Sequence, residues 1–197
     1  YIDIFCEKGY FSVEDMESIV NAGKHYDLIP KVHVNQFNII GGVPSAVKLG
    51  ALSVDHLEVV DQEDIDALKN SATMPTLLPS CSFFLNIPYA PARKMMNEGL
   101  PGCIASDYNP GSTPSGNMNF VLSLACIQMK MNPEEAINAA TINGAYAMGI
   151  SKSEGSIAKG KKGNVFITKQ IPSYAFLPYN FGHNTIKKVF INGCEFK

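Results

Sequence analysis

Short apolar segments alternate with helix-patterned segments along the first 150 residues, and this alternation restricts the fold more than any other feature of the sequence. The apolar segments have few polar positions on either face, which is typical of parallel strands buried on both sides. A strand–helix–strand order of this kind predicts an α/β fold with a parallel sheet. The five predicted strands cover residues 1–6, 31–34, 52–57, 73–79 and 102–107.

Helix signals separate these strands. Ser12 and Asp15 have the spacing of a capping box, and Asn132 followed by Pro133 has the pattern of a helix start. The predicted helices cover residues 12–26, 43–50, 61–71, 89–99, 117–130 and 133–147, and residues 80–88 are predicted to form a loop.

After about residue 150 the sequence changes to short apolar runs joined by glycines, as in "GSIAKGKKGNVFITK" and "TIKKVFINGCEF". This pattern predicts short antiparallel strands. We therefore expect an α/β part over residues 1–150 and a small β-sandwich-type segment over residues 151–197.

Charge and cysteine content exclude several classes of function. Sixteen basic and eighteen acidic residues give a net charge of -2, and the one basic cluster, "KGKKG" at residues 159–163, is short and glycine-flanked. We expect neither a nucleic-acid nor a membrane partner. The five cysteines form no C-x-x-C pair, which favours reduced thiols and a cytoplasmic location.

Three polar residues stand at the ends of predicted strands: His33, His56 and Asp107. In a parallel α/β sheet, active-site groups stand at the carboxyl ends of the strands. Each residue has a purely structural explanation by itself: a satisfied core histidine, a loop histidine beside Asp55, and a turn aspartate. Two imidazoles and one carboxylate at the same edge nevertheless form a set that binds a divalent metal.

The order "KVHVNQ", "SVDHLE", "ASDYNPGS" and the tail "GSIAKGKKGNVFI" resembles the amidohydrolase superfamily. The resemblance implies a TIM-like (β/α)8 barrel, of which this chain carries the second half, strands 4–8, with "YIDIFC" as the fourth strand. In that family the first strand supplies a His-x-His pair of metal ligands, and the sequence contains no such pair. The resemblance thus implies that the chain carries only part of an active site.

Further segments narrow the resemblance to one branch of the superfamily: "DIFCEKGYFS", "LLPSCSFFL", "YAPARKMMNEG" and "SDYNPGSTPSGNM". The branch hydrolyses the cyclic amide of 4-imidazolone-5-propanoate to N-formimidoyl-L-glutamate in histidine degradation. The resemblance implies a small-molecule substrate and one divalent metal, zinc or iron. The most specific segment is the run from Asp107 to Ser112, an aspartate followed by an Asn-Pro-Gly loop.

The resemblance also implies roles for individual residues. His33 and Asp107 would be metal ligands, while His56 would polarise the lactam carbonyl and Asp107 would accept a proton from the attacking water. The positions that match substrate contacts are Gln36, Asn109, Gly111 and Ser112. Some relatives have glutamate where this chain has Gln36; because an amide cannot carry a proton away, we assign the base to Asp107.

Two alternatives remain open. Another amidohydrolase, a deaminase or a cyclic-imide hydrolase, would share the two histidines and the aspartate without the Asn-Pro-Gly loop, and a non-catalytic α/β fragment would use its histidines structurally. A half-barrel also has two open sheet edges, which predicts a homo-oligomer or self-association through those edges.

Overall fold

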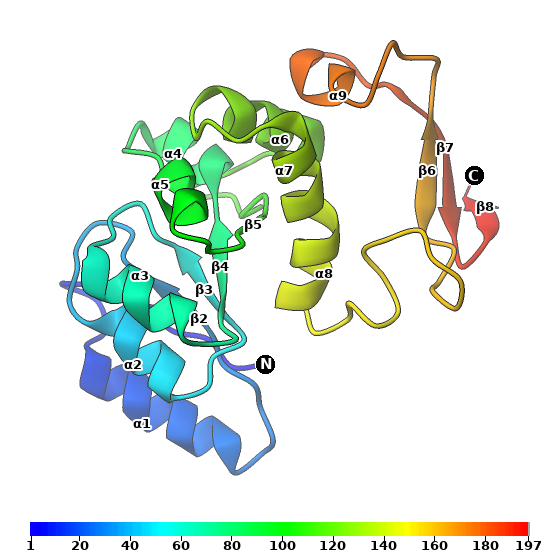
Figure 1. Cartoon of the computed structure of the whole chain (residues 1–197). Helices are drawn as coiled ribbons and strands as arrows, with labels where there is room; N and C mark the ends of the chain where they lie inside the picture. The colour runs from blue at the N-terminus through cyan, green and yellow to red at the C-terminus, as the bar shows by residue number, and fades with distance from the viewer. Residues whose placement is uncertain (197) are drawn as a thin grey trace.

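The computed structural model describes residues 1–196 and contains one five-stranded parallel sheet, in the order β1-β2-β3-β4-β5 (Figure 1). Spatial order equals sequence order, as in successive units of a β/α barrel, so the predicted α/β class is confirmed. The strands are β1 (Phe5–Cys6), β2 (Lys31–Val34), β3 (Ser53–His56), β4 (Met74–Leu77) and β5 (Cys103–Ile104).

Helices connect the strands and cover the outer face of the sheet. Helix α1 (Val13–Lys24) packs on β1 and on α2 (Gly42–Lys48), and α2 packs on β2 and on α3 (Gln62–Lys69) (Figure 1). The predicted capping box of Ser12 and Asp15 is present, and Asp61 with Asp64 forms a second one at the start of α3. The helices of this part are α1 (Val13–Lys24), α2 (Gly42–Lys48), α3 (Gln62–Lys69), α4 (Pro79–Leu85), α5 (Ala92–Asn97), α6 (Met118–Ile127), α7 (Pro133–Asn138), the π-helix η1 (Ala139–Asn143) and α8 (Gly144–Ala147).

Alternation along β2 shows how the sheet separates core from site. Val32 and Val34 are fully buried in the hydrophobic core, whereas Lys31 and His33 point to the opposite, inner face. On that face the Lys31 ammonium donates to Ser53 Oγ at 2.8 Å and to the carbonyl of Ala147 at 2.7 Å. Because Lys31 opens its strand, this pair of bonds ties the end of α8 to the amino-terminal end of the sheet.

Three sequence predictions need correction. The predicted loop at residues 80–88 begins with a helix, α4, since Pro79 occupies the first helical turn, where its absent N–H costs nothing. Strands β1 and β5 are only two residues long, because each pairs with its neighbouring strand at two positions only. The predicted helix 133–147 is interrupted by η1, where the widened turn directs the Asn143 amide to the carbonyl of Gly102 at 2.8 Å.

The C-terminal part contains one three-stranded antiparallel sheet; the short antiparallel strands of the prediction are present, but the described residues form no second sheet that would make a β-sandwich. Its strands are β6 (Val165–Thr168), β7 (Ile186–Ile191) and β8 (Cys194–Phe196), and β7 and β8 form a hairpin whose two turn residues, Asn192 and Gly193, both have positive φ. The short helix α9 (Phe176–Tyr179) packs on α6, where Ser123 Oγ donates to the carbonyl of Pro178 at 2.6 Å. The segment after residue 150 is thus anchored to the α/β part.

Among residues 1–196, no helix combines the length and the hydropathy that a membrane crossing requires.

Candidate active site

Non-glycine residues with left-handed backbone mark the carboxyl ends of three strands. Asn35 follows β2 with φ 56°, His56 and Leu57 end β3 with φ 90° and 63°, and Asp107 follows β5 with φ 52°. This conformation costs free energy for residues with a Cβ atom and is concentrated at functional sites, where the fold holds it in place. The strained positions include two of the three site residues that the sequence predicts, His56 and Asp107.

His33 lies on the inner face of β2, with about a third of its side chain exposed. Its Nδ1 is 2.9 Å from Oδ1 of Asp3. Burial alone would lower the pKa of His33, but the hydrogen bond to Asp3 and the charges of Asp3, Asp55 and Asp107 outweigh burial and raise it. The Asp3 contact fixes the ring so that Nε2 is its free ligand atom.

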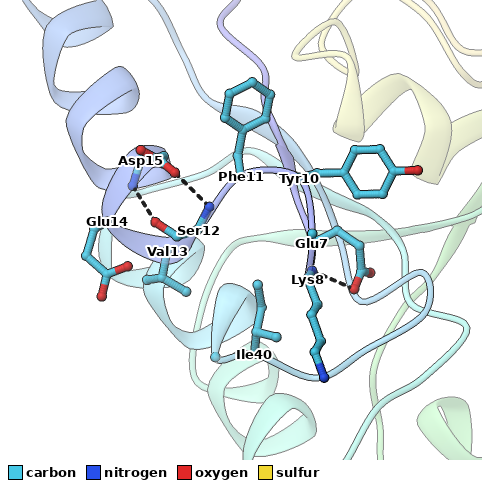
Figure 2. Close-up of a pocket in the computed structure, with 11 residues that line it drawn as sticks. Glu7, Lys8, Tyr10, Phe11, Ser12, Val13, Glu14, Asp15 and Ile40 are labelled. Carbon is cyan, nitrogen blue, oxygen red and sulfur yellow. Dashed lines mark hydrogen bonds between the residues drawn. The ribbon is translucent and has the colours of Figure 1, made fainter.

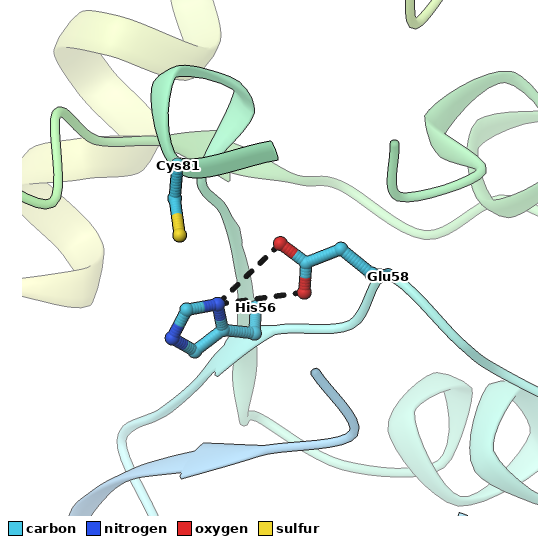
Figure 3. A group of neighbouring side chains, drawn as sticks. All are labelled: His56, Glu58 and Cys81. Carbon is cyan, nitrogen blue, oxygen red and sulfur yellow. Dashed lines mark hydrogen bonds and ion pairs between the residues drawn. The ribbon is translucent and has the colours of Figure 1, made fainter. Parts of the chain in front are cut away.

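His56, at the end of β3, is almost completely buried, and its ring centroid is 5.3 Å from that of His33. Its Nδ1 faces the carboxylate of Glu58, which also accepts a hydrogen bond of 3.1 Å from Ser82 Oγ (Figure 3). The two histidines that the sequence predicts are therefore neighbours at one edge of the sheet.

Gln36 is buried two residues beyond β2, and its amide Nε2 is 3.5 Å from Sγ of Cys81 on α4. Burial, followed by the charge of Asp107, raises the pKa of the Cys81 thiol to about 12. Cys81 is thus a neutral thiol at neutral pH, and it lies where the strand ends of β2 and β5 approach α4.

Asp107 begins a loop that is ordered by its own side chains. Asn109 Oδ1 accepts from the backbone amides of Gly111 and Ser112, each at 2.8 Å, and its Nδ2 donates to Ser112 Oγ at 2.7 Å. Ser112 Oγ in turn donates to Asp107 Oδ2 at 3.1 Å. The Asn-Pro-Gly segment therefore holds the Asp107 carboxylate in place, and direct contacts of Asn109, Gly111 and Ser112 with a substrate stay a prediction.

Glu7, a buried acid just after β1, holds the loop that carries Gln36. Its carboxylate accepts from the backbone amide of Phe37 at 2.9 Å and from Asn38 Nδ2 at 3.0 Å. Glu7 also lies on the wall of a pocket of about 560 Å³ beside the start of α1 (Figure 2). The dashed lines in Figure 2 mark only the α1 capping box and the Glu7–Lys8 turn, which are bonds within the protein, and we assign this pocket no ligand.

Asn35 connects the same loop to α3. Its Nδ2 donates to Asp64 Oδ2 at 2.7 Å, and Asp64 is 1% exposed. Burial raises the pKa of Asp64 from its ordinary value of 3.8 to about 6, although the Asp61 and Asn35 hydrogen bonds lower it. The carboxylate thus stays partly protonated at mildly acidic pH.

This shift predicts a pH dependence of stability. The folded state binds the Asp64 proton more tightly than the unfolded chain, so ionisation of Asp64 destabilises the fold, progressively from about pH 4 to pH 6 and fully above. Relative to Asp64→Asn, the free energy of unfolding of the unmodified chain should fall by up to about 3 kcal/mol between pH 4 and pH 7. Urea denaturation at a series of pH values measures this difference, and parallel curves for the two proteins would contradict it.

The residues at this edge fit a divalent metal ion. A metal-binding histidine commonly donates its second ring nitrogen to a carboxylate, as His33 does to Asp3. His33 Nε2 thus offers an imidazole nitrogen, and the Asp107 carboxylate, whose charge contributes to the raised pKa of His33, offers the oxygen ligand of the predicted set. This donor set suits zinc or iron.

With this geometry in view, comparison with known proteins identifies the class. The sequence profile described as "Amidohydrolase family" matches residues 9–195, so the chain belongs to the amidohydrolase family. Among curated proteins, the imidazolonepropionase of Flavobacterium johnsoniae is 65% identical over 193 residues, which make up 98% of this chain and 47% of that protein. The imidazolonepropionase of Parabacteroides distasonis is 44% identical over 193 residues, covering 98% of this chain and 46% of its own length. The chain thus spans about half the length of the curated relatives it matches.

Solved structures share the fold at low sequence identity. A. niger ochratoxinase superposes with a TM-score of 0.79 at 21% identity, over 100% of this chain and 50% of its own. An adenosine deaminase from Xanthomonas campestris with bound zinc superposes with a TM-score of 0.76 at 17% identity, over 94% of this chain and 49% of its own. Together with the family match, these likenesses establish an amidohydrolase fold.

The sequence prediction missed the residues that support the site histidines. Asp3 lies within the first predicted strand, where alternation with Phe5 could have placed it on the inner face beside His33. Glu58 lies two residues beyond His56 in "DHLE", and Ser82 lies in the segment predicted as a loop. No sequence signal relates Ser82 to Glu58, because only the packing of α4 brings them together.

Proposed function

We propose that this chain supplies strands 4–8 and part of the active site of an enzyme that hydrolyses the cyclic amide of 4-imidazolone-5-propanoate to N-formimidoyl-L-glutamate. The observation that carries the proposal is the proximity of His33 and His56, whose ring centroids are 5.3 Å apart at the carboxyl edge of an amidohydrolase sheet. The name of the relatives at 65% identity supports this substrate.

The residues of this chain divide the reaction between them. His33, held by Asp3, and Asp107 would bind one divalent metal, which when bound lowers the pKa of water toward neutrality. The Asp107 carboxylate accepts the proton of the attacking water and returns it to the ring nitrogen when the C–N bond breaks. His56 donates a hydrogen bond from Nε2 to the carbonyl oxygen, where negative charge develops.

Gln36 and the Asp107 loop would position the substrate. Gln36 can donate and accept hydrogen bonds but cannot take up a proton, which assigns the proton transfer to Asp107. Burial keeps the Gln36 amide beside Cys81, so its orientation is set before a substrate arrives.

A substrate panel tests the proposal. The chain, joined to the remaining strands of the barrel, should open the ring of imidazolone propionate, and the loss of imidazolone absorbance measures this reaction. The same enzyme should act on adenine, guanine and cyclic imides at least about 100-fold more slowly. If the enzyme prefers a purine base or a cyclic imide, that compound replaces imidazolone propionate as the proposed substrate. No turnover on any of them, together with no bound metal, would favour a non-catalytic role.

A further inference from the structure

Glu58 is a buried carboxylate to which the proposed reaction gives no role. Its side chain is 1% exposed, and among residues 1–196 the one basic group paired with it is the ring of His56. A buried negative charge destabilises a fold unless it is paired and hydrogen-bonded. The position of Glu58 beside a site histidine therefore suggests that the carboxylate has a functional role.

The contacts of Glu58 hold the His56 ring from one side. Nδ1 of His56 is 3.4 Å from both Oε1 and Oε2 of Glu58, and Oε2 has no other polar partner among the described residues. Ser82 Oγ donates to Oε1 at 3.1 Å and so anchors the carboxylate to α4. Figure 3 shows Nδ1 turned toward Glu58 and the other ring nitrogen pointing away from it.

The backbone supports the same orientation. The positive φ of His56 and Leu57 turns the chain sharply at the end of β3, which brings Glu58 back beside the ring two residues later. Neither residue is glycine, so this turn costs free energy that the surrounding fold must supply.

We propose that Glu58 is a positioning residue that acts through His56: its carboxylate accepts a hydrogen bond from the Nδ1–H group and thereby turns Nε2 toward the substrate carbonyl. The inference rests on the proposed function and deepens it. When His56 donates from Nε2 while Nδ1 also carries a proton, the ring is positively charged, and Glu58 stabilises that charge as the acid does in a Ser-His-Asp triad. Ser82 keeps the carboxylate aligned.

A metal site is the competing interpretation of these side chains. Ligand atoms of His56, Glu58 and Cys81 lie within 4.8 Å of one another, and all three residues are buried. Imidazole, carboxylate and thiolate are all zinc ligands. A metal held there would occupy His56 and remove it from the reaction, so the two interpretations predict opposite effects of zinc and of Cys81 replacement.

The test compares kcat and KM of the complete enzyme with those of its variants Glu58→Gln, Glu58→Asp and Glu58→Leu. Glu135→Gln is the matched control, because Glu135 lies on α7 and is paired with Arg93 rather than with a site residue. We expect kcat to fall about 10- to 100-fold in Glu58→Gln and further in Glu58→Leu, with KM changed less than about threefold, and Glu58→Asp to recover part of the loss. Glu135→Gln should leave kcat unchanged. If Glu58→Leu fails to fold, the other two variants still decide.

A second readout separates positioning from general structural support. With ¹⁵N-labelled histidine, Nδ1 of His56 should be protonated in the unmodified enzyme, with a second proton on Nε2 when that nitrogen donates to the carbonyl, and the preference for a proton on Nδ1 should be lost in Glu58→Leu. Unchanged kcat, or a lower kcat with an unchanged tautomer, would overturn the proposal. So would uptake of an additional zinc ion that Cys81→Ser abolishes. If the unmodified enzyme opens no imidazolone ring, the proposed function fails, while the tautomer measurement still decides whether Glu58 orients His56.

Discussion

Replacement of Asp107 by asparagine in the complete enzyme should lower kcat about 1000-fold or more. An amide cannot accept the proton of the attacking water, and general-base catalysis commonly contributes about 100- to 10,000-fold. Asn is nearly isosteric with Asp, and the loop that holds position 107 is built from Asn109 and Ser112, so the backbone should stay in place. Loss of imidazolone absorbance with time measures the effect.

Three further variants make the result specific. Gln36→Glu should change kcat by less than about fivefold, because the proposed proton route does not pass through position 36. Ser112→Ala removes the hydroxyl that donates to Asp107 Oδ2 and should cost about tenfold. Asp66→Asn makes the same chemical change on the exposed face of α3 and should have no effect. Full activity of Asp107→Asn would exclude Asp107 as the base.

Much of the fold follows from local sequence patterns. Strand β2 matches its predicted bounds, residues 31–34, because valines alternate with inward-facing polar residues and helices flank both ends. The capping box at Ser12 likewise places α1 correctly. Strand length at the sheet edges was overestimated, since hydrophobicity indicates burial whereas a strand ends where its neighbour's hydrogen bonds end.

The candidate site was predictable only where a polar side chain interrupts an apolar strand. His33 and His56 stand out for that reason, and Asp107 stands out through its turn residues. Asp3 also interrupts an apolar strand and was overlooked, whereas Glu58 and Ser82 gave no such signal, because their role depends on contacts with α4. A sequence therefore indicates the residues that would contact a metal or substrate more readily than the residues that orient them.

The oligomeric state of the isolated chain affects any assay of that chain. Strands β1 and β5 each pair with only one other strand within residues 1–196. Large apolar side chains are exposed near both edges, including Tyr10 and Phe11 beyond β1 and Phe83 and Tyr108 near β5. Unpaired edges and apolar surface favour association, so light scattering over a concentration series should detect oligomers, and a monomer at every concentration would contradict the half-barrel proposal.

The chain by itself should show no measurable ring opening and should retain no metal through dialysis against a weak chelator. The proposed ligands of this chain, His33 and Asp107, number only two, whereas catalytic zinc sites commonly use three protein ligands or more. Joined to the remaining strands of the barrel, the same 197 residues should hold about one metal ion per chain, and turnover should appear with it. Elemental analysis after dialysis and the absorbance assay measure both quantities in both proteins, and His33→Ala in the complete protein should reproduce the metal loss. Ring opening by the isolated chain would show that these residues carry more of the active site than we propose.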